Sequence, residues 1–112
     1  MKPEAVNIVV LVTSVSLEEA NKIASLLLTE RKAACINIVP EINSMFWWKG
    51  RIETTRESLL IIKTIAELLQ DIVETVKKYN SYEVPEIIAL PIVGGNVDYL
   101  QWITKEVGAA KK

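Results

Sequence analysis

The chain has 112 residues, half of them hydrophobic, so length and composition predict a single domain with a hydrophobic core over residues 1–112. Its 13 basic residues nearly balance 14 acidic ones, which argues against nucleic acid and anionic membranes as partners. Histidine is absent, which excludes serine hydrolase and histidine-zinc chemistry.

Cysteine usage and the N-terminal sequence predict the compartment. The single cysteine, Cys35, excludes a disulfide within the chain, and no pattern of a cleavable signal peptide is seen. No run of about 18 or more apolar residues is present, so no membrane span is expected. We therefore expect a cytoplasmic protein.

The first 31 residues predict a strand and a helix. Residues 6–13 form a continuous apolar run rich in β-branched side chains, which is typical of a central strand covered on both faces. Ser16 and Glu19 have the spacing of a capping box at a helix start. Apolar residues at helical spacing then predict a helix to about Arg31, with a stripe of Ala20, Ile23, Ala24, Leu27 and Leu28.

Residues 33–64 predict two long strands joined by a turn at Lys49 and Gly50. Pro40 marks a bulge or an edge position in the first strand. The returning strand is polar near the turn and apolar over residues 59–62, so its base is expected to be buried on both faces. Apolar residues recur at even positions of the first strand and predict one buried face, made of Ala34, Ile36, Ile38, Pro40, Ile42, Phe46 and Trp48.

The length of this hairpin predicts a contact between chains. A strand of about 15 residues spans roughly 50 Å, whereas a compact chain of about 100 residues has a radius of gyration near 13 Å. The tip, with Phe46, Trp47 and Trp48, must therefore fold back over the chain's own helices or protrude toward another chain. Three aromatic rings beside a charged returning strand favour an oligomer interface.

The second half predicts a helix, a strand and a short final helix. Residues 64–67 match a second capping box, and the helix after it has an apolar stripe of Leu68, Leu69, Ile72, Val73 and Val76. Residues 80–86 form a polar turn, and residues 87–92 form the last strand. Asn96 caps a helix that carries Val97, Leu100, Ile103 and Val107, before a tail of alanine and lysine that is expected to fray.

The predicted order of elements is βαββαβ with an extra C-terminal helix. This order is typical of an α+β, ferredoxin-like sandwich in which both main helices cover one face of the sheet. Right-handed crossovers make the first and third strands neighbours.

The densest polar cluster is the turn of Tyr82, Glu83 and Glu86, with Lys63 at the end of the third strand and Asp98 after the last one. Two carboxylates three residues apart in a rigid turn either bind a cation or belong to an ordinary surface loop. No nucleophile with an activating base can be assembled from these residues, so we do not expect an enzyme.

Two other features have alternative interpretations. The thiolate of Cys35 suits copper, but a single cysteine in a strand is also ordinary packing. Trp47 and Trp48 beside Arg51 can stack on a base or a ring, although the lack of a basic surface favours an interface.

Three segments of the chain resemble the CutA family of divalent-cation tolerance proteins. They are residues 33–64 with their WWKG turn, SYEVPEIIALPI at 81–92 and GNVDYLQWI at 95–103, and the resemblance extends over nearly the whole chain. It implies a ferredoxin-like protomer in a tight homotrimer, with long hairpins exchanged between neighbours. It also implies a link to tolerance of copper and other divalent cations.

The resemblance also suggests site residues. Cys35 matches the cysteine of the family's ACVNI-type strand, and residues 82–86 match its YEVPE turn. Asn80 and Ser81 stand where relatives commonly have His-Pro, so a metal here relies on Cys35, Glu83 and Glu86, with Tyr82 or backbone oxygens.

Three functions are compatible with the sequence. The first is a homotrimer that binds copper or another divalent cation. The second is a small-molecule sensor like the trimeric PII signalling proteins, with a cleft between chains lined by Trp48, Lys63, Tyr82 and Glu86. In that cleft Lys63 is expected at the same end of the sheet as the turn at 82–86. The third function is a purely structural scaffold.

Overall fold

The computed structural model describes residues 6–108, and the order of elements confirms the predicted ferredoxin-like fold. The expected fraying of the tail concerns residues 109–112, which lie outside the described residues. The elements are β1 (Asn7–Ser14), α1 (Leu17–Thr29), β2 (Cys35–Trp48), β3 (Arg51–Ile65), a 3-10 turn η1 (Ala66–Leu68), α2 (Leu69–Tyr79), β4 (Ile87–Pro91) and α3 (Val97–Glu106).

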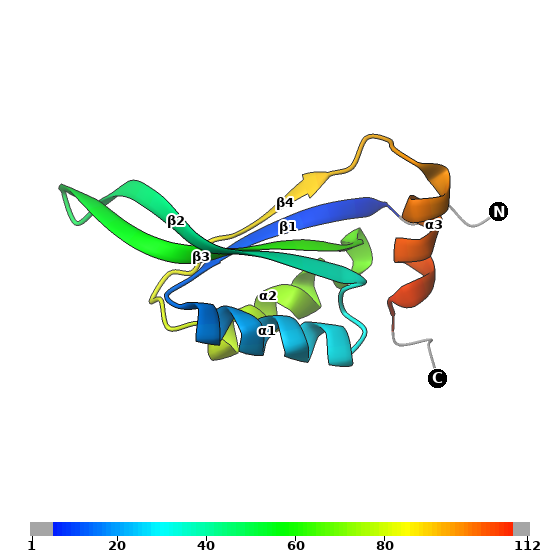
Figure 1. Cartoon of the computed structure of the whole chain (residues 1–112), viewed down its shortest axis with the longest axis horizontal. Helices are drawn as coiled ribbons and strands as arrows, with labels where there is room; N and C mark the ends of the chain where they lie inside the picture. Colours follow the sequence, from blue (N-terminus) through cyan, green and yellow to red (C-terminus); the bar gives the residue numbers. More distant parts are fainter. Residues whose placement is uncertain (1–5, 109–112) are drawn as a thin grey trace.

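The four strands form one antiparallel sheet in the order β2-β3-β1-β4, so the first and third strands are neighbours as predicted. Helices α1 and α2 lie together on one face of this sheet, and α3 lies across one end of it (Figure 1). The main core fills the space between the sheet and the two helices, where the largest fully buried side chains are Val10, Val12, Ile23, Leu27, Leu60, Ile62, Ile72 and Val76. None of the described helices is long and apolar enough to cross a membrane.

The N-cap hydrogen bonds predicted at Ser16 and Asn96 are confirmed, but only half of the Ser16–Glu19 capping box forms, because the Glu19 carboxylate accepts from Ser14 and Ser81 instead. Ser16 Oγ accepts a hydrogen bond from the backbone N–H of Glu19 at 3.1 Å, and Asn96 Oδ1 accepts one from Asp98 at 3.0 Å. The predicted capping box at residues 64–67 is wrong, because Thr64 still belongs to β3 and pairs with Ile8. Its hydroxyl donates to the carbonyl of Lys32 at 2.7 Å, and α2 begins after a 3-10 turn without a side-chain cap.

The β2-β3 hairpin forms an arm that extends beyond the rest of the molecule (Figure 1). At its tip Lys49 and Gly50 both have positive φ angles, 52° and 79°, as a two-residue type I′ hairpin turn requires. The molecule measures 51 × 27 × 21 Å along its principal axes. The arm thus protrudes, and the alternative in which it folds back over its own helices is excluded.

Pro40 lies in a β-bulge, and this bulge changes the face on which the β2 side chains lie. The register between β2 and β3 shifts between Val39 and Ile42, and Ser58 Oγ donates to the carbonyl of Pro40 at 2.8 Å. Before the bulge, Ile36 and Ile38 pack against the helix-side core. After it, the even-numbered residues Ile42, Phe46 and Trp48 pair with Glu57, Glu53 and Arg51 and lie on the opposite face. The prediction that all even positions share one buried face is therefore wrong beyond Pro40.

The sheet face away from α1 and α2 is apolar and only half covered. Leu59 and Ile61 of β3 are half-buried, and Ile88 and Leu90 of β4 are each 48% exposed. The predicted burial of the β3 base on both faces therefore holds fully only for the helix side, where Leu60 and Ile62 are inaccessible to solvent. This uncovered face, which we call the open face, continues along the arm.

Candidate functional site

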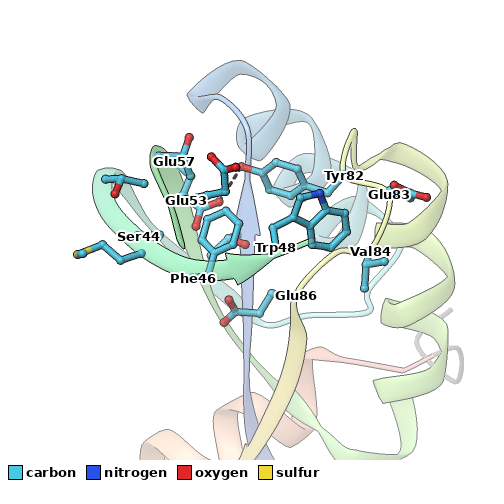
Figure 2. Close-up of a pocket in the computed structure, with 13 residues that line it drawn as sticks. Ser44, Phe46, Trp48, Glu53, Glu57, Tyr82, Glu83, Val84 and Glu86 are labelled. Atoms are coloured by element: carbon cyan, nitrogen blue, oxygen red, sulfur yellow. Dashed lines mark hydrogen bonds between the residues drawn. The ribbon is translucent and has the colours of Figure 1, made fainter. Parts of the chain in front are cut away.

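A groove with a volume of about 740 Å³ lies between the arm and the turn that precedes β4. Figure 2 shows that the arm contributes Phe46 and Trp48, and that the turn contributes Tyr82 and Glu86. The groove is lined by Thr13, Ser44, Met45, Phe46, Trp48, Glu53, Thr54, Thr55, Glu57, Tyr82, Glu83, Val84 and Glu86.

The bulge at Pro40 places the arm side of this groove. After the bulge, Phe46 and Trp48 lie on the same face of the arm as Glu57; Phe46 pairs directly with Glu53, and Trp48 pairs with Arg51. Phe46 and Trp48 are 41% and 38% exposed, so their rings stay accessible along the groove.

Asn80 attaches the other wall of the groove to the sheet. Its side-chain Nδ2 donates to the carbonyl of Thr13 at 2.9 Å, and its Oδ1 accepts from the backbone N–H of Tyr82 at 2.9 Å. Asn80 is only 9% exposed; its hydrogen bond to Thr13 is buried, and its hydrogen bond to Tyr82 is partly buried. They fix the start of the turn next to the end of β1.

Glu19 holds the same turn from the side of α1. Its carboxylate accepts hydrogen bonds from Ser14 Oγ at 2.6 Å, from the backbone N–H of Ser81 at 3.1 Å and from Ser81 Oγ. Burial alone raises the pKa of Glu19, but the hydrogen bonds from Ser14 and Ser81 outweigh it and lower the pKa overall. Asn80 and Ser81 therefore act as structural anchors of the turn.

Tyr82 and Glu57 form the central polar contact of the groove. Tyr82 Oη donates a hydrogen bond to Glu57 Oε2 at 2.6 Å. Glu57 is only 8% exposed. Burial, the hydrogen bond to Glu57 and the Glu57 charge all raise the pKa of Tyr82. The phenol therefore stays protonated and remains a hydrogen-bond donor to the carboxylate.

Removing this phenol is expected to destabilise the protein by about 1–3 kcal/mol at neutral pH, because Tyr82→Phe leaves Glu57 without its donor. The raised pKa stabilises the wild type below the ordinary tyrosine pKa of about 10, and this contribution is lost as the pH rises through the raised value. The difference between wild type and variant should therefore shrink above about pH 10. Denaturant unfolding over a pH series measures it.

The matched control is Tyr79→Phe, since no side-chain hydrogen bond is found for Tyr79 among the described residues. That variant should show a small, nearly pH-independent change. Equal losses in the two variants would show that the Tyr82 hydroxyl has no special role.

All charged residues that line the groove are acidic. Glu53, Glu57, Glu83 and Glu86 line it, and none of its lining residues is a lysine or an arginine. The ion pairs found among residues 6–108 join Arg31 to Glu106, Lys32 to Glu30 and Arg56 to Glu41, and none involves a groove carboxylate. Such a groove attracts cations.

Three of the four predicted cleft residues, Trp48, Tyr82 and Glu86, line this groove, but Lys63 does not. Lys63 pairs with Val9 and Cys35 near the other end of the sheet, and its Nζ donates to Asn37 Oδ1. The turn enters the sheet at Ile87, opposite Val12. The prediction that Lys63 and the turn meet at one end of the sheet is therefore wrong within one chain, because the antiparallel register separates them.

The predicted metal ligands also lie apart within one chain. Cys35 begins β2 opposite Lys63 and is half-buried, whereas Glu83 and Glu86 lie at the groove. Residues 6–108 contain no group of three His, Cys, Asp or Glu side chains placed to hold a metal ion. The sequence analysis placed Asp98 in one polar cluster with residues 82–86. In the structure, Asp98 lies in the first turn of α3.

Sequence reasoning missed Glu53 and Glu57 as site residues. The sequence held a weak signal: Glu53, Thr55 and Glu57 lie on one face of a strand whose next residue on that face, Leu59, is apolar. The approach of Tyr82 to Glu57 depends on tertiary packing and leaves no local pattern. Only the structure shows that these two residues meet.

A ferredoxin-like sheet with a protruding arm and a groove of carboxylates and aromatic rings defines a small α+β protein with one candidate site among the described residues. Residues 8–106 match the family described as CutA1 divalent ion tolerance protein. The chain belongs to this family, which confirms the resemblance seen in its sequence.

Relatives and solved structures agree with this assignment. The chain is 50% identical over 97 residues to Protein CutA 1, chloroplastic, of Oryza sativa, covering 87% of this chain and 55% of that protein. It is 45% identical over 100 residues to the divalent-cation tolerance protein CutA of Thermus thermophilus, covering 89% and 97%. The chain thus spans about half the length of the plant relative and nearly all of the bacterial one.

The same fold is found in crystal structures. CutA1 from Oryza sativa superposes with a TM-score of 0.90 at 46% identity, covering 94% of this chain and 96% of that one. The periplasmic divalent cation tolerance protein CutA from Archaeoglobus fulgidus gives 0.88 at 41% identity, covering 91% and 99%. The α+β sandwich is therefore the fold of this family.

Proposed function

We propose that the protein acts in divalent-cation tolerance as a cytoplasmic homotrimer that binds copper or another divalent cation at sites completed between neighbouring chains, and that it is not an enzyme. The observation that carries the proposal is the match of residues 8–106 to the CutA1 divalent ion tolerance family; within one chain, however, Cys35 lies apart from Glu83 and Glu86. A ligand set drawn from these residues needs two chains. The free thiol of Cys35 suits a reducing compartment such as the cytoplasm.

The surface of the chain supports assembly. The open face is apolar and half covered, and the arm displays Met45, Trp47 and Ile52, which are 74%, 72% and 60% exposed. Apolar surface of this kind marks protein interfaces. The family resemblance implies three chains. In a closed head-to-tail ring, each chain uses both of its contact surfaces, so none is left exposed.

The donor set fits metal binding across such a ring. Cys35 offers a soft thiolate, which selects copper(I), and Glu83 and Glu86 offer carboxylates, which suit harder divalent ions. These donors lie toward opposite ends of the chain. A head-to-tail arrangement can therefore bring the cysteine of one chain to the carboxylates of the next.

Subunit mixing tests this arrangement. Cys35→Ser and the double variant Glu83→Gln/Glu86→Gln are each expected to lose most copper binding as pure proteins. Unfolding and refolding the two together should restore about a quarter of the wild-type sites, because one neighbour pair in four then combines an intact cysteine with intact carboxylates. Copper titration of the mixed protein gives the number of sites.

The control is Glu67→Gln, an exposed carboxylate outside the groove, which should leave copper binding unchanged. Pure Cys35→Ser protein with wild-type copper affinity would remove the thiol from the site. A mixture that recovers no sites would contradict the placement between chains.

A small-molecule sensor is a second candidate, and the groove itself favours it. A cavity of about 740 Å³ with aromatic walls has the size and character of a ligand site, whereas a purely structural scaffold does not need one.

A further inference from the structure

We propose that the groove between the arm and the 82–86 turn binds a linear aliphatic polyamine, a chain of protonated amines separated by methylene groups. The inference rests on the sensor alternative, and its groove shares Glu83 and Glu86 with the copper proposal. Its test therefore uses Glu53 and Glu57, which the subunit-mixing test does not change.

The first observation is a buried carboxylate without a cationic partner. Glu57 is 8% exposed, and among the described residues it accepts one side-chain hydrogen bond, from Tyr82, and forms no ion pair. Taking a carboxylate out of water is costly unless it is paired and hydrogen-bonded. The phenol is neutral, so the negative charge of Glu57 remains unbalanced.

The second oxygen of Glu57 has no hydrogen-bond partner among the described residues and is not sealed from solvent. The structure shows no hydrogen bond to Glu57 Oε1. Among residues 6–108, every side-chain nitrogen or oxygen that is sealed from solvent has a hydrogen-bond partner. Oε1 has no partner, so it must be open to solvent. Since Glu57 lines the groove, we infer that a ligand in the groove can reach this oxygen. The groove therefore presents a shielded acceptor that an ammonium group can bind.

The spacing of the carboxylates favours an extended ligand over a metal ion. Glu53 and Glu57 lie on one face of β3, four residues and about 13 Å apart. Glu83 and Glu86 lie on the opposite wall. No three acidic side chains among the described residues come close enough to hold one ion. A polyamine distributes its charges along a chain and can contact carboxylates that one metal ion cannot join.

The aromatic walls fit the same ligand. Ammonium groups are attracted to ring faces, and methylene groups pack against them. Phe46, Trp48 and Tyr82 all line the groove, but no ring-to-ring contact is found between them, so they form open walls and not a closed cage for one quaternary ammonium. The Lys49 ammonium lies 5.9 Å from the Trp48 ring centroid, so one cation of the chain itself already lies near this ring.

The cations nearest in sequence, Lys49 and Arg51, lie at the tip of the arm and do not line the groove. Inside it, four carboxylates face three aromatic rings without a basic side chain. A basic side chain from a neighbouring copy is the main competing occupant. The test below separates it from a free polyamine.

Titration calorimetry of the assembled 112-residue chain with spermidine tests the proposal. Saturable binding is expected, with affinity rising from putrescine to spermidine to spermine as the number of charges rises. Glu53→Gln and Glu57→Gln should each weaken spermidine binding about ten- to a hundredfold. Glu53 is exposed, so its variant is expected to fold normally even if Glu57→Gln does not.

Matched controls separate a specific site from general attraction to an acidic protein. Glu18→Gln and Glu74→Gln remove exposed carboxylates from α1 and α2 outside the groove and should leave the affinity unchanged. Magnesium chloride at equal ionic strength should not displace spermidine.

Three results would overturn the proposal. One is equal weakening by the groove variants and the controls. Another is unchanged affinity in Glu53→Gln and Glu57→Gln. The third is absence of saturable binding, the result expected if a neighbouring chain fills the groove. Copper binding by Glu53→Gln, measured in parallel, reports on the metal site separately.

Discussion

Replacing Leu60 by alanine is expected to lower the free energy of unfolding by about 2–5 kcal/mol. Leu60 is inaccessible to solvent in β3 and lies between Val12 of β1 and Ile38 of β2 in the sheet. Its side chain fills the space between the sheet and the two helices. A close-packed core relaxes only partly around such a deletion, so the lost apolar burial and the cavity both contribute.

Leu28→Ala is the matched control, since the same chemical change is made at a residue of α1 that is 40% exposed. Its cost should stay below about 1 kcal/mol. Both variants are compared with the wild type by denaturant unfolding at one protein concentration, because assembly couples to stability. Equal losses at the two positions would mean that the sheet-helix core does not dominate the stability of this chain.

The sequence predicted the order of elements well, because each element carries a local signal. The apolar run at residues 6–13 became the central strand β1, and the caps at Ser16 and Asn96 form as expected. Thr64 shows where local signals fail. Its capping pattern is real, but pairing with Ile8 in the ladder keeps it in β3. Tertiary pairing decided between two locally reasonable structures.

The bulge at Pro40 explains the main error about the arm. Pro40 itself predicted a bulge or an edge position, but alternation in the sequence continues across it, so the pattern does not show that the later side chains move to the other face. Phe46 and Trp48 consequently line a groove, although the same pattern predicted that they share a buried face with Ile36.

The candidate site was predicted in part for a similar reason. Tyr82, Glu83 and Glu86 form a compact polar turn that sequence inspection finds. Their position against Glu57 depends on hydrogen bonds between distant residues, such as Ser81 to Glu19 and Asn80 to Thr13. The position predicted for Lys63 was wrong because the antiparallel pairing of β3 with β1, and not the residue type, decides at which end of the sheet Lys63 lies.

The double variant Trp47→Ser/Ile52→Ser is expected to convert the assembled protein into monomers. These two residues pair across β2 and β3 near the tip of the arm, and they are 72% and 60% exposed in the single chain. Burying one tryptophan removes about 150–250 Å² from water, which is equivalent to about 4–6 kcal/mol of apolar burial before the costs of association. Each chain of a ring contributes one arm, so the change is repeated at every interface.

The matched control lies on the other face of the arm. Trp48→Ala removes an equally large ring, but one that lines the groove, so this variant should stay assembled and bind spermidine more weakly. Sedimentation velocity on the wild type and both variants at micromolar concentration measures the assembly. A folded wild-type monomer would contradict the proposed trimer outright. If the double variant stays trimeric instead, the half-covered face with Leu59 and Ile61, and not the arm tip, must hold the chains together.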